Sequence, residues 1–135
     1  MNTILVGTDT SAAADLAVES AARLALDRGA ELLVLYVQPG SDLKTVVDPD
    51  LAADPAAYLR RVAGRFPGVA VRTRTERGEP ADKIVDVAEE EAVETIVLGN
   101  RGVHGSRWRV RDSVPTMVLR HSPCSVFIVD TRRAQ

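Results

Sequence analysis

Three glycines, Gly99, Gly102 and Gly105, follow an apolar run at intervals of three residues. Glycine lets backbone N–H groups approach an anion closely, because no Cβ stands in the way. A helix expected to begin at Ser113 would add a positive N-terminal end that favours phosphate. The same spacing is typical of an ordinary turn, and no GK[ST] sequence marks a Walker loop. The stretch is therefore a candidate phosphate-binding loop with a plain structural alternative.

A second candidate is Asp9, which directly follows the apolar run 3–8. A carboxylate at the carboxyl end of a strand is well placed to accept a hydrogen bond from an amino or hydroxyl group of a ligand. Asp9, Thr10 and Ser11 are also residue types that cap helices, so Asp9 has a second interpretation as part of the cap of the next helix. The sequence leaves both interpretations open.

Short apolar runs predict the strands that carry these residues. The runs cover residues 3–8, 31–37, 69–76, 94–99 and 125–130. All but the third are near-continuous aliphatic runs, which are typical of strands buried on both faces of a parallel sheet. In the third run, valine and threonine alternate with Arg72, Arg74 and Glu76, so one face is wet and we expect this strand at an edge of the sheet.

Apolar residues at helical spacing predict helices between the strands. The helix after the first strand has Thr10 or Ser11 as its N-cap and Gly29 as its C-terminal stop. Pro80 suits the first turn of a later helix, whereas Gly64 weakens the helix that contains it. Residues 40–54 are expected to form a flexible connection. The predicted helices cover residues 11–28, 54–66, 80–91 and 113–121.

The alternation of strands and helices predicts an α/β fold with a single five-stranded parallel sheet and helices on both faces. Right-handed crossovers place the chain on both faces only if the strand order reverses at one point. Ligands bind at the carboxyl ends of the strands beside that reversal. A ligand is therefore expected to bind near the residues that follow Val6, Val37 and Leu98.

The composition is that of an ordinary globular protein, with 45% hydrophobic and 27% charged residues, and 135 residues suit one domain over 1–135. A net charge of -2 gives no general attraction to nucleic acid. Cys124 is the single cysteine, so neither an internal disulfide nor a cysteine zinc cluster is available. The N-terminus lacks the features of a signal peptide, and no run approaches the length of a membrane helix. We expect a cytoplasmic protein without membrane contact.

Several motifs resemble those of universal stress proteins. The spacing of Gly99, Gly102 and the pair Ser113 and Val114 is similar to the family signature G-2x-G-9x-G-[ST]. The opening ILVGTDTS resembles the family's ILVPVDGS, and VPTMVLRHSPCSVFIVD resembles its closing V-x-x-x-V-L-R-H-A-P-C-P-V-L-V-V. The stretch RGEPADKIVDVAEEEAVETIVLGNRG is similar to GDPAEEILEAAEEEGADLIVMGSRG. The likeness covers nearly the whole chain except residues 40–68.

The resemblance implies a Rossmann-like sheet in the order 3-2-1-4-5, a homodimer through the strand Ser125 to Asp130 and, in one branch of the family, a site for ATP or another adenine nucleotide. By position, Asp9 and the backbone of Val37 would meet adenine, and Gly78 would close the pocket beside the sugar. The glycines at 99 and 102 would flank ribose and phosphate, and residues 113 and 114 would contact phosphate oxygens. The candidate nucleotide-binding residues are Thr8, Asp9, Val37, Gly78, Gly99, Arg101, Gly102, Gly105, Asp112, Ser113 and Val114.

Asp112 departs from the family pattern, because it stands where the signature has glycine. A unit negative charge about 4 Å from a phosphate costs about 4 kcal/mol at an effective dielectric of about 20. The nearby Arg101, Arg107, Arg109 and Arg111 offer relief, since guanidinium groups bind phosphate well, and Mg²⁺ would turn Asp112 into a ligand. The alternative is that Asp112 caps the last helix and leaves the pocket blocked.

The remaining chemically interesting residues favour structural roles. The arginines around Trp108 resemble a platform for a single nucleic-acid strand, but one short loop on an acidic domain is thin support, and we expect no nucleic acid. Trp108 is instead expected at the dimer surface or the pocket mouth. His104 and His121 lack a third ligand at metal spacing, and Cys124 is expected to be buried and inert.

The sequence therefore supports two main hypotheses. The first is a stress-response regulatory dimer that binds an adenine nucleotide, with Mg²⁺ if the nucleotide is ATP. The second is an interaction module of the same fold whose pocket is closed by Asp112. No catalytic constellation can be assembled, so we expect no enzyme, with slow ATP hydrolysis as a third alternative.

Overall fold

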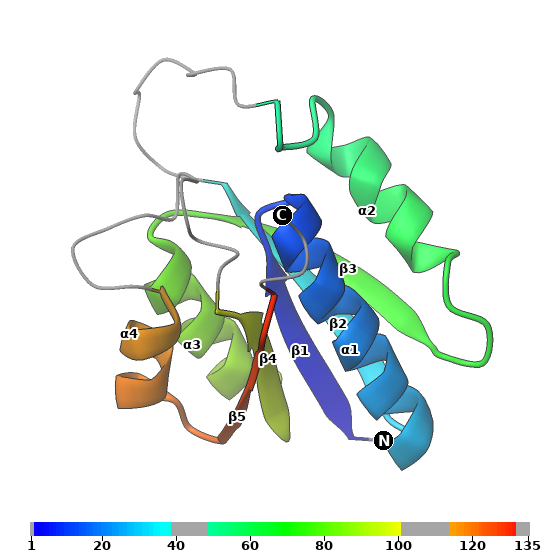
Figure 1. Ribbon diagram of the computed structural model, residues 1–135. Coiled ribbons are helices and arrows are strands. Elements are labelled where there is room, and N and C mark those ends of the chain that lie inside the picture. The colour runs from blue at the N-terminus through cyan, green and yellow to red at the C-terminus, as the bar shows by residue number, and fades with distance from the viewer. Residues whose placement is uncertain (1, 39–48, 101–113, 132–135) are drawn as a thin grey trace.

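The strands form one parallel sheet, which a computed structural model describes over residues 2–38, 49–100 and 114–131 (Figure 1). The strand order is β3-β2-β1-β4-β5, as the family resemblance implied. Every neighbouring pair is parallel. The strands are β1 (Thr3–Thr8), β2 (Glu31–Gln38), β3 (Val71–Arg77), β4 (Thr95–Gly99) and β5 (Ser125–Val129).

Helices cover both faces of this sheet. The helices are α1 (Ala12–Arg28), α2 (Pro55–Ala63), α3 (Pro80–Glu90) and α4 (Val114–His121). One apolar cluster joins α1 and α2 to one face of the central strands, and a second joins α3 and α4 to the opposite face. Because β1 lies between β2 and β4, the chain changes direction across the sheet at this point. The predicted α/β architecture is confirmed.

The ends of α1 follow from local chemistry. Ser11 is the N-cap, and its hydroxyl accepts the N–H of Ala14 at 3.1 Å. Gly29 ends the helix in the left-handed region, with φ of 62°, where a side chain would be strained. Both boundary signals of the sequence are therefore confirmed.

The second helix is shorter than the sequence indicates. We expected it to reach residue 66, but α2 ends at Ala63 and Gly64 is its C-cap. Asp54 starts the helix by accepting the N–H of Ala57 at 3.1 Å, and Pro55 fills the first turn. Gly64 thus lies at the end of the helix, with φ of -102°, and not inside it.

Strand β3 lies at an edge, as its alternating pattern predicts. Its arginines pair with carboxylates instead of packing into a core. Arg72 contacts Glu91 at 2.9 Å, and Arg74 contacts the same carboxylate at 3.1 Å. Hydrogen bonds from Arg72 lower the pKa of Glu91 most strongly, against the effect of burial. Charged side chains on an edge strand discourage pairing with other chains.

The expectation that the fifth strand is buried on both faces is wrong. Its aliphatic run predicts burial on both faces, but Phe127 is 49% exposed and Val129 alone is buried. The reason is that β5 is the other edge of the sheet, so its side chains receive less cover than those of the central strands. Composition alone does not distinguish a central strand from an apolar edge strand.

Within the three described ranges, no helix combines enough length with enough apolar character to cross a membrane.

Candidate functional site

A buried turn connects β1 to α1 at the carboxyl end of the sheet. Thr8 is fully buried and Asp9 is 4% exposed. The Thr10 N–H donates to Oγ1 of Thr8 at 2.9 Å, and the Ser11 N–H donates to Oδ1 of Asp9 at 2.9 Å. The turn is therefore built by its own side chains. Ser11 caps the helix, while the Asp9 carboxylate holds the turn that precedes the cap.

Strand register brings several candidate residues to this same edge. Thr8 pairs with Tyr36, so Asp9 and Val37 lie one residue further along neighbouring strands. Val37 is fully buried, and its side chain packs in the cluster on the α3 side of the sheet. Its side chain is therefore part of the core, and the contact of its backbone with adenine stays a prediction.

Gly78 follows β3 and lies beside the end of β2. Its N–H donates to the carbonyl of Gln38 at 2.9 Å. Its φ is 140°, a conformation that residues with side chains rarely adopt, and a Cβ would come within 3.0 Å of Cε of Lys83. The backbone therefore requires glycine here, whether or not a ligand lies nearby.

Gly99 ends β4 and has close neighbours of its own. A Cβ at this position would lie 2.8 Å from Cγ2 of Thr131 and 3.6 Å from the carbonyl oxygen of Ala13. The adjacent Asn100 accepts both the N–H and the hydroxyl of Thr131, at 3.1 and 3.2 Å. Packing therefore supplies a reason for glycine at 99 that is independent of phosphate binding.

The remaining candidates belong to the glycine-rich loop. Val114 is the first residue of α4, and its side chain is fully buried in the cluster shared with α3. A phosphate could thus meet its backbone but not its side chain. The other loop candidates lie outside the described residues, namely Arg101, Gly102, Gly105, Asp112 and Ser113.

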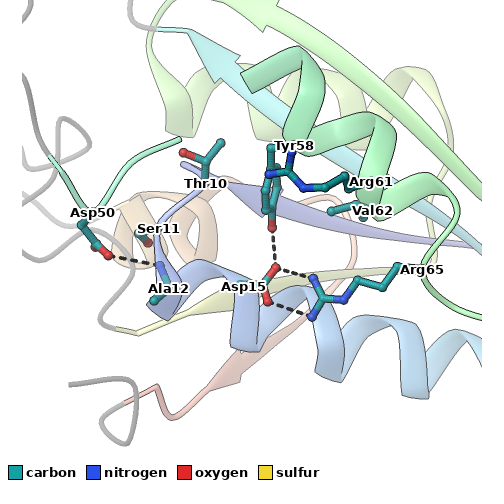
Figure 2. Close-up of a pocket in the computed structure, with 9 residues that line it drawn as sticks. All are labelled: Thr10, Ser11, Ala12, Asp15, Asp50, Tyr58, Arg61, Val62 and Arg65. Atoms are coloured by element: carbon teal, nitrogen blue, oxygen red, sulfur yellow. Dashed lines mark hydrogen bonds and ion pairs between the residues drawn. The ribbon is translucent and has the colours of Figure 1, made fainter. Parts of the chain in front are cut away.

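A pocket of about 430 Å³ adjoins the β1–α1 turn on the side of α2 (Figure 2). In Figure 2, the Tyr58 hydroxyl points at the Asp15 carboxylate, which also faces Arg65. The hydroxyl donates to Oδ1 of Asp15 at 2.6 Å, and Arg65 donates to both carboxylate oxygens at 2.7 and 2.8 Å. The pocket is lined by Thr10, Ser11, Ala12, Asp15, Asp50, Tyr58, Arg61, Val62 and Arg65.

The protein environment shifts the ionisation of this group. Burial raises the pKa of Asp15, but the hydrogen bonds from Arg65 and Tyr58 outweigh it, so the carboxyl pKa lies below its usual value. Burial and the adjacent Asp15 raise the pKa of the Tyr58 phenol well above its usual range. Tyr58 therefore remains a hydrogen-bond donor to a charged carboxylate at neutral pH.

Our sequence reasoning did not identify Asp15, Tyr58 or Arg65 as a group. Tyr58 and Arg65 lie 43 and 50 residues from Asp15, and each reads locally as an ordinary helix residue. No motif spacing links residues that come together only when α1 and α2 pack on the same face of the sheet. The single local hint is a carboxylate in the first turn of α1, which is also a common stabilising placement.

Of the residues for which the sequence favoured structural roles, His121 and Cys124 are described, whereas His104 and Trp108 lie outside the described residues. His121 ends α4 and lines a pocket of about 460 Å³ together with Asp82, Asp86 and Glu89 of α3. Among the described residues, no three His, Cys, Asp or Glu side chains are grouped to hold a metal ion. Cys124 was expected to be buried but is only half-buried, with its sulfur 3.7 Å from the Ser122 hydroxyl. It precedes an edge strand, which leaves it partly open.

Comparison with known proteins identifies the family. The profile of the Universal stress protein family matches residues 1–130. Universal stress protein YxiE of Bacillus subtilis is 28% identical, over 95% of this chain and 98% of its own length.

Solved structures show the same fold. A universal stress protein in complex with cAMP has a TM-score of 0.75 and 27% identity, covering 96% of this chain and 97% of its own. Universal stress protein UspA from Lactobacillus plantarum has a TM-score of 0.72 and 29% identity, covering 95% of this chain and 97% of its own. Because the sequence profile spans almost the whole chain and the strand order agrees with it, this chain belongs to the universal stress protein family.

Proposed function

We propose that this protein is a stress-response regulatory module that binds an adenine nucleotide at the carboxyl ends of β1 and β4. The observation that carries the proposal is the Asp9 carboxylate, which is buried beside the reversal of strand order, where ligands bind in sheets of this kind. The universal stress protein of similar structure in complex with cAMP supports the choice of an adenine nucleotide.

The proposed contacts follow from the chemistry of the two components of the nucleotide. Asp9 accepts from the amino group of adenine, and the backbone of Val37 supplies further hydrogen bonds beside the ring. Gly78 lies by the sugar, and Gly99 lies between ribose and phosphate. The remaining proposed contacts to ribose and phosphate come from Thr8, Arg101, Gly102, Gly105, Ser113 and Val114.

Asp112 determines how strong this binding is. Unrelieved, its charge beside a phosphate costs about 4 kcal/mol, and every ~1.4 kcal/mol changes affinity tenfold. We propose that the arginines of the loop offset this cost, with Mg²⁺ bridging Asp112 and phosphate when the nucleotide is ATP. The alternative function is a dimeric interaction module that binds no nucleotide. Asp112 in place of the signature glycine favours this alternative.

Two measurements test the proposal. Heat denaturation of the purified protein should release ATP, ADP or AMP, and calorimetric titration with ATP, with and without Mg²⁺, should give a dissociation constant. Asp112→Gly should tighten binding of ATP in the absence of Mg²⁺. Asp112→Asn removes one charge beside the proposed phosphate. Its matched control is Asp27→Asn, which removes one charge from an exposed part of α1. No released nucleotide together with no heat of binding would favour the interaction module.

The protein is further proposed to act by binding and not by catalysis. The sequence offers no nucleophile with an adjacent base, and slow ATP hydrolysis remains the alternative to test by phosphate release. A cytoplasmic location and a single domain over 1–135 stay predictions. Fractionation of cells that express the tagged chain would check the location.

We also propose a homodimer through residues Ser125 to Asp130. Strand β5 is an edge whose Phe127 is half-exposed, and an apolar edge strand is suited to pair with a second copy. Light scattering at micromolar concentration should give the dimer mass, and Phe127→Glu should give the monomer mass. Leu26→Glu is the matched control, because Leu26 is an equally exposed apolar residue on α1. A wild-type protein of monomer mass would reject the dimer.

A further inference from the structure

Residues 50–65, here called the arm, contact the β1–α1 turn from outside the sheet. The Ala52 N–H donates to Oγ1 of Thr10 at 2.8 Å. A longer contact of 3.4 Å joins the Ala12 N–H to Oδ1 of Asp50. Both contacts end on the three residues that follow Asp9. The arm therefore reaches the turn that carries the proposed adenine ligand.

The contact from Ala52 is important because Thr10 has an unusual backbone conformation. Its φ is 74°, which is uncommon for a residue with a side chain and more so for a β-branched one. Such a conformation persists only when surrounding contacts hold it. Here the Thr10 N–H is bound by Thr8, and the Thr10 hydroxyl is bound by Ala52 of the arm. One restraint on Thr10 thus comes from a segment 42 residues away in sequence.

A second attachment lies one turn further along α1. The Tyr58 hydroxyl, from the arm, donates to Asp15, which Arg65 also binds through both carboxylate oxygens. The arm is thus bonded to the turn at Thr10 and to the first turn of α1 at Asp15.

These polar contacts are distinct from the packing that docks α2. Leu59 and Val62 are buried in the cluster beneath α2, so apolar contacts already hold the helix on the sheet. Between the arm and the start of α1 lies the open pocket of Figure 2, so polar contacts, and not close packing, connect the two there. These hydrogen bonds end on Thr10 of the turn and on Asp15 in the first turn of α1.

We propose that the arm positions the β1–α1 turn, and through it Asp9, with Tyr58 and Thr10 as positioning residues. The proposal rests on the proposed function, because Asp9 is the group to be positioned for an adenine nucleotide. The arm holds the left-handed Thr10 from one side and the start of α1 from the other, so the Asp9 carboxylate is presented in one orientation. Loosening the arm lowers the affinity for nucleotide without unfolding the sheet.

The test uses the full chain, with AMP as the probe and two readouts. Calorimetry gives the dissociation constant for AMP, and amide hydrogen exchange by NMR reports the Thr10 and Ser11 amides relative to the Leu33 amide of central strand β2. We expect Tyr58→Phe and Thr10→Ala to weaken AMP binding about three- to tenfold, which corresponds to one lost hydrogen bond. Both should speed exchange at the two turn amides relative to Leu33.

Two variants separate positioning from general stability. Thr10→Ser keeps the hydroxyl and should retain wild-type affinity and exchange. Val87→Ala makes a cavity beneath α3, on the opposite face of the sheet, so it should lower the free energy of unfolding without changing AMP affinity. The variants therefore distinguish the loss of the Tyr58 and Thr10 hydroxyls from a general loss of stability.

Unchanged turn exchange in Tyr58→Phe and Thr10→Ala overturns the positioning proposal, as does faster exchange with unchanged AMP affinity. An equal loss of affinity in Val87→Ala overturns it too, because it indicates a general effect of stability. If the wild-type chain binds no AMP, the proposed function fails on its own, and the exchange readout still decides whether the arm positions the turn.

Discussion

Gly99→Ala should weaken the fold because a methyl group has no room at this position. Its Cβ would lie 2.8 Å from Cγ2 of Thr131, and 3.7 Å from Cβ of Ala17. Thr131 is 1% exposed, and its hydrogen bonds to Asn100 hold it in place. It cannot move away from the new methyl group without losing these hydrogen bonds. Overpacking of this kind costs about 1–3 kcal/mol. We expect a loss of about 2 kcal/mol in the free energy of unfolding.

A double-mutant cycle identifies the clash. Thr131→Ser removes Cγ2 but keeps the hydroxyl that bonds Asn100, and by itself it should cost about 1 kcal/mol for the lost buried methyl. In the double variant the new Cβ at 99 occupies the space of the missing methyl. The double variant should therefore be about as stable as Thr131→Ser alone. Urea denaturation followed by circular dichroism measures all four proteins.

Gly64→Ala is the matched control for this cycle. Gly64 has φ of -102°, and no atom lies within 4 Å of the position that a Cβ would take, so alanine is tolerated there. It should be neutral or gain up to about 1 kcal/mol through the unfolded chain. Additive losses in the cycle, or a Gly99→Ala protein as stable as wild type, would refute the packing role of Gly99. Gly99 would then be explained by the ligand or the loop.

Three further predictions concern Asp15, Gly29 and Arg72. The pKa of Asp15 is lowered in the folded state, so the stability that its carboxylate contributes is present above the unfolded pKa of about 4 and is lost as pH falls through the folded pKa. Asp15→Asn should therefore reduce the loss of unfolding free energy at acid pH, as measured by urea denaturation. An unchanged dependence of stability on pH would contradict this. Gly29→Ala places a side chain at φ of 62° and should cost about 1–2 kcal/mol by urea denaturation, whereas a neutral effect would contradict the strain argument. Arg72→Ala breaks an exposed pairing with Glu91 and should cost less than about 1 kcal/mol, a loss that shrinks in salt; a loss unaffected by salt would contradict it.

The parts of the fold that the sequence predicted are those with local causes. The caps of α1 depend on Ser11 and Gly29, which lie at the ends of the helix that they define. The edge position of β3 shows in its own alternation of charged residues with valine and threonine. The sheet order came from the family resemblance, because strand order is not written in any single segment.

The parts that the sequence did not predict depend on neighbours. Gly64 reads as a weak point within a helix, but the chain ends the helix there. The residues of β5 are as apolar as those of a central strand, and its half-exposed Phe127 follows from its place in the sheet. The same holds for Cys124, whose half-burial depends on the edge that it adjoins.

For the candidate site, the sequence alone indicated Asp9 and the glycine-rich loop, because a carboxylate after a strand and glycines before a helix are local patterns. Tertiary structure decided what surrounds Asp9. It brought Tyr58 onto Asp15 across 43 residues and placed Ala52 on the strained Thr10. Contacts over such separations depend on how two helices pack on one face of the sheet, and that packing is a property of the folded chain as a whole.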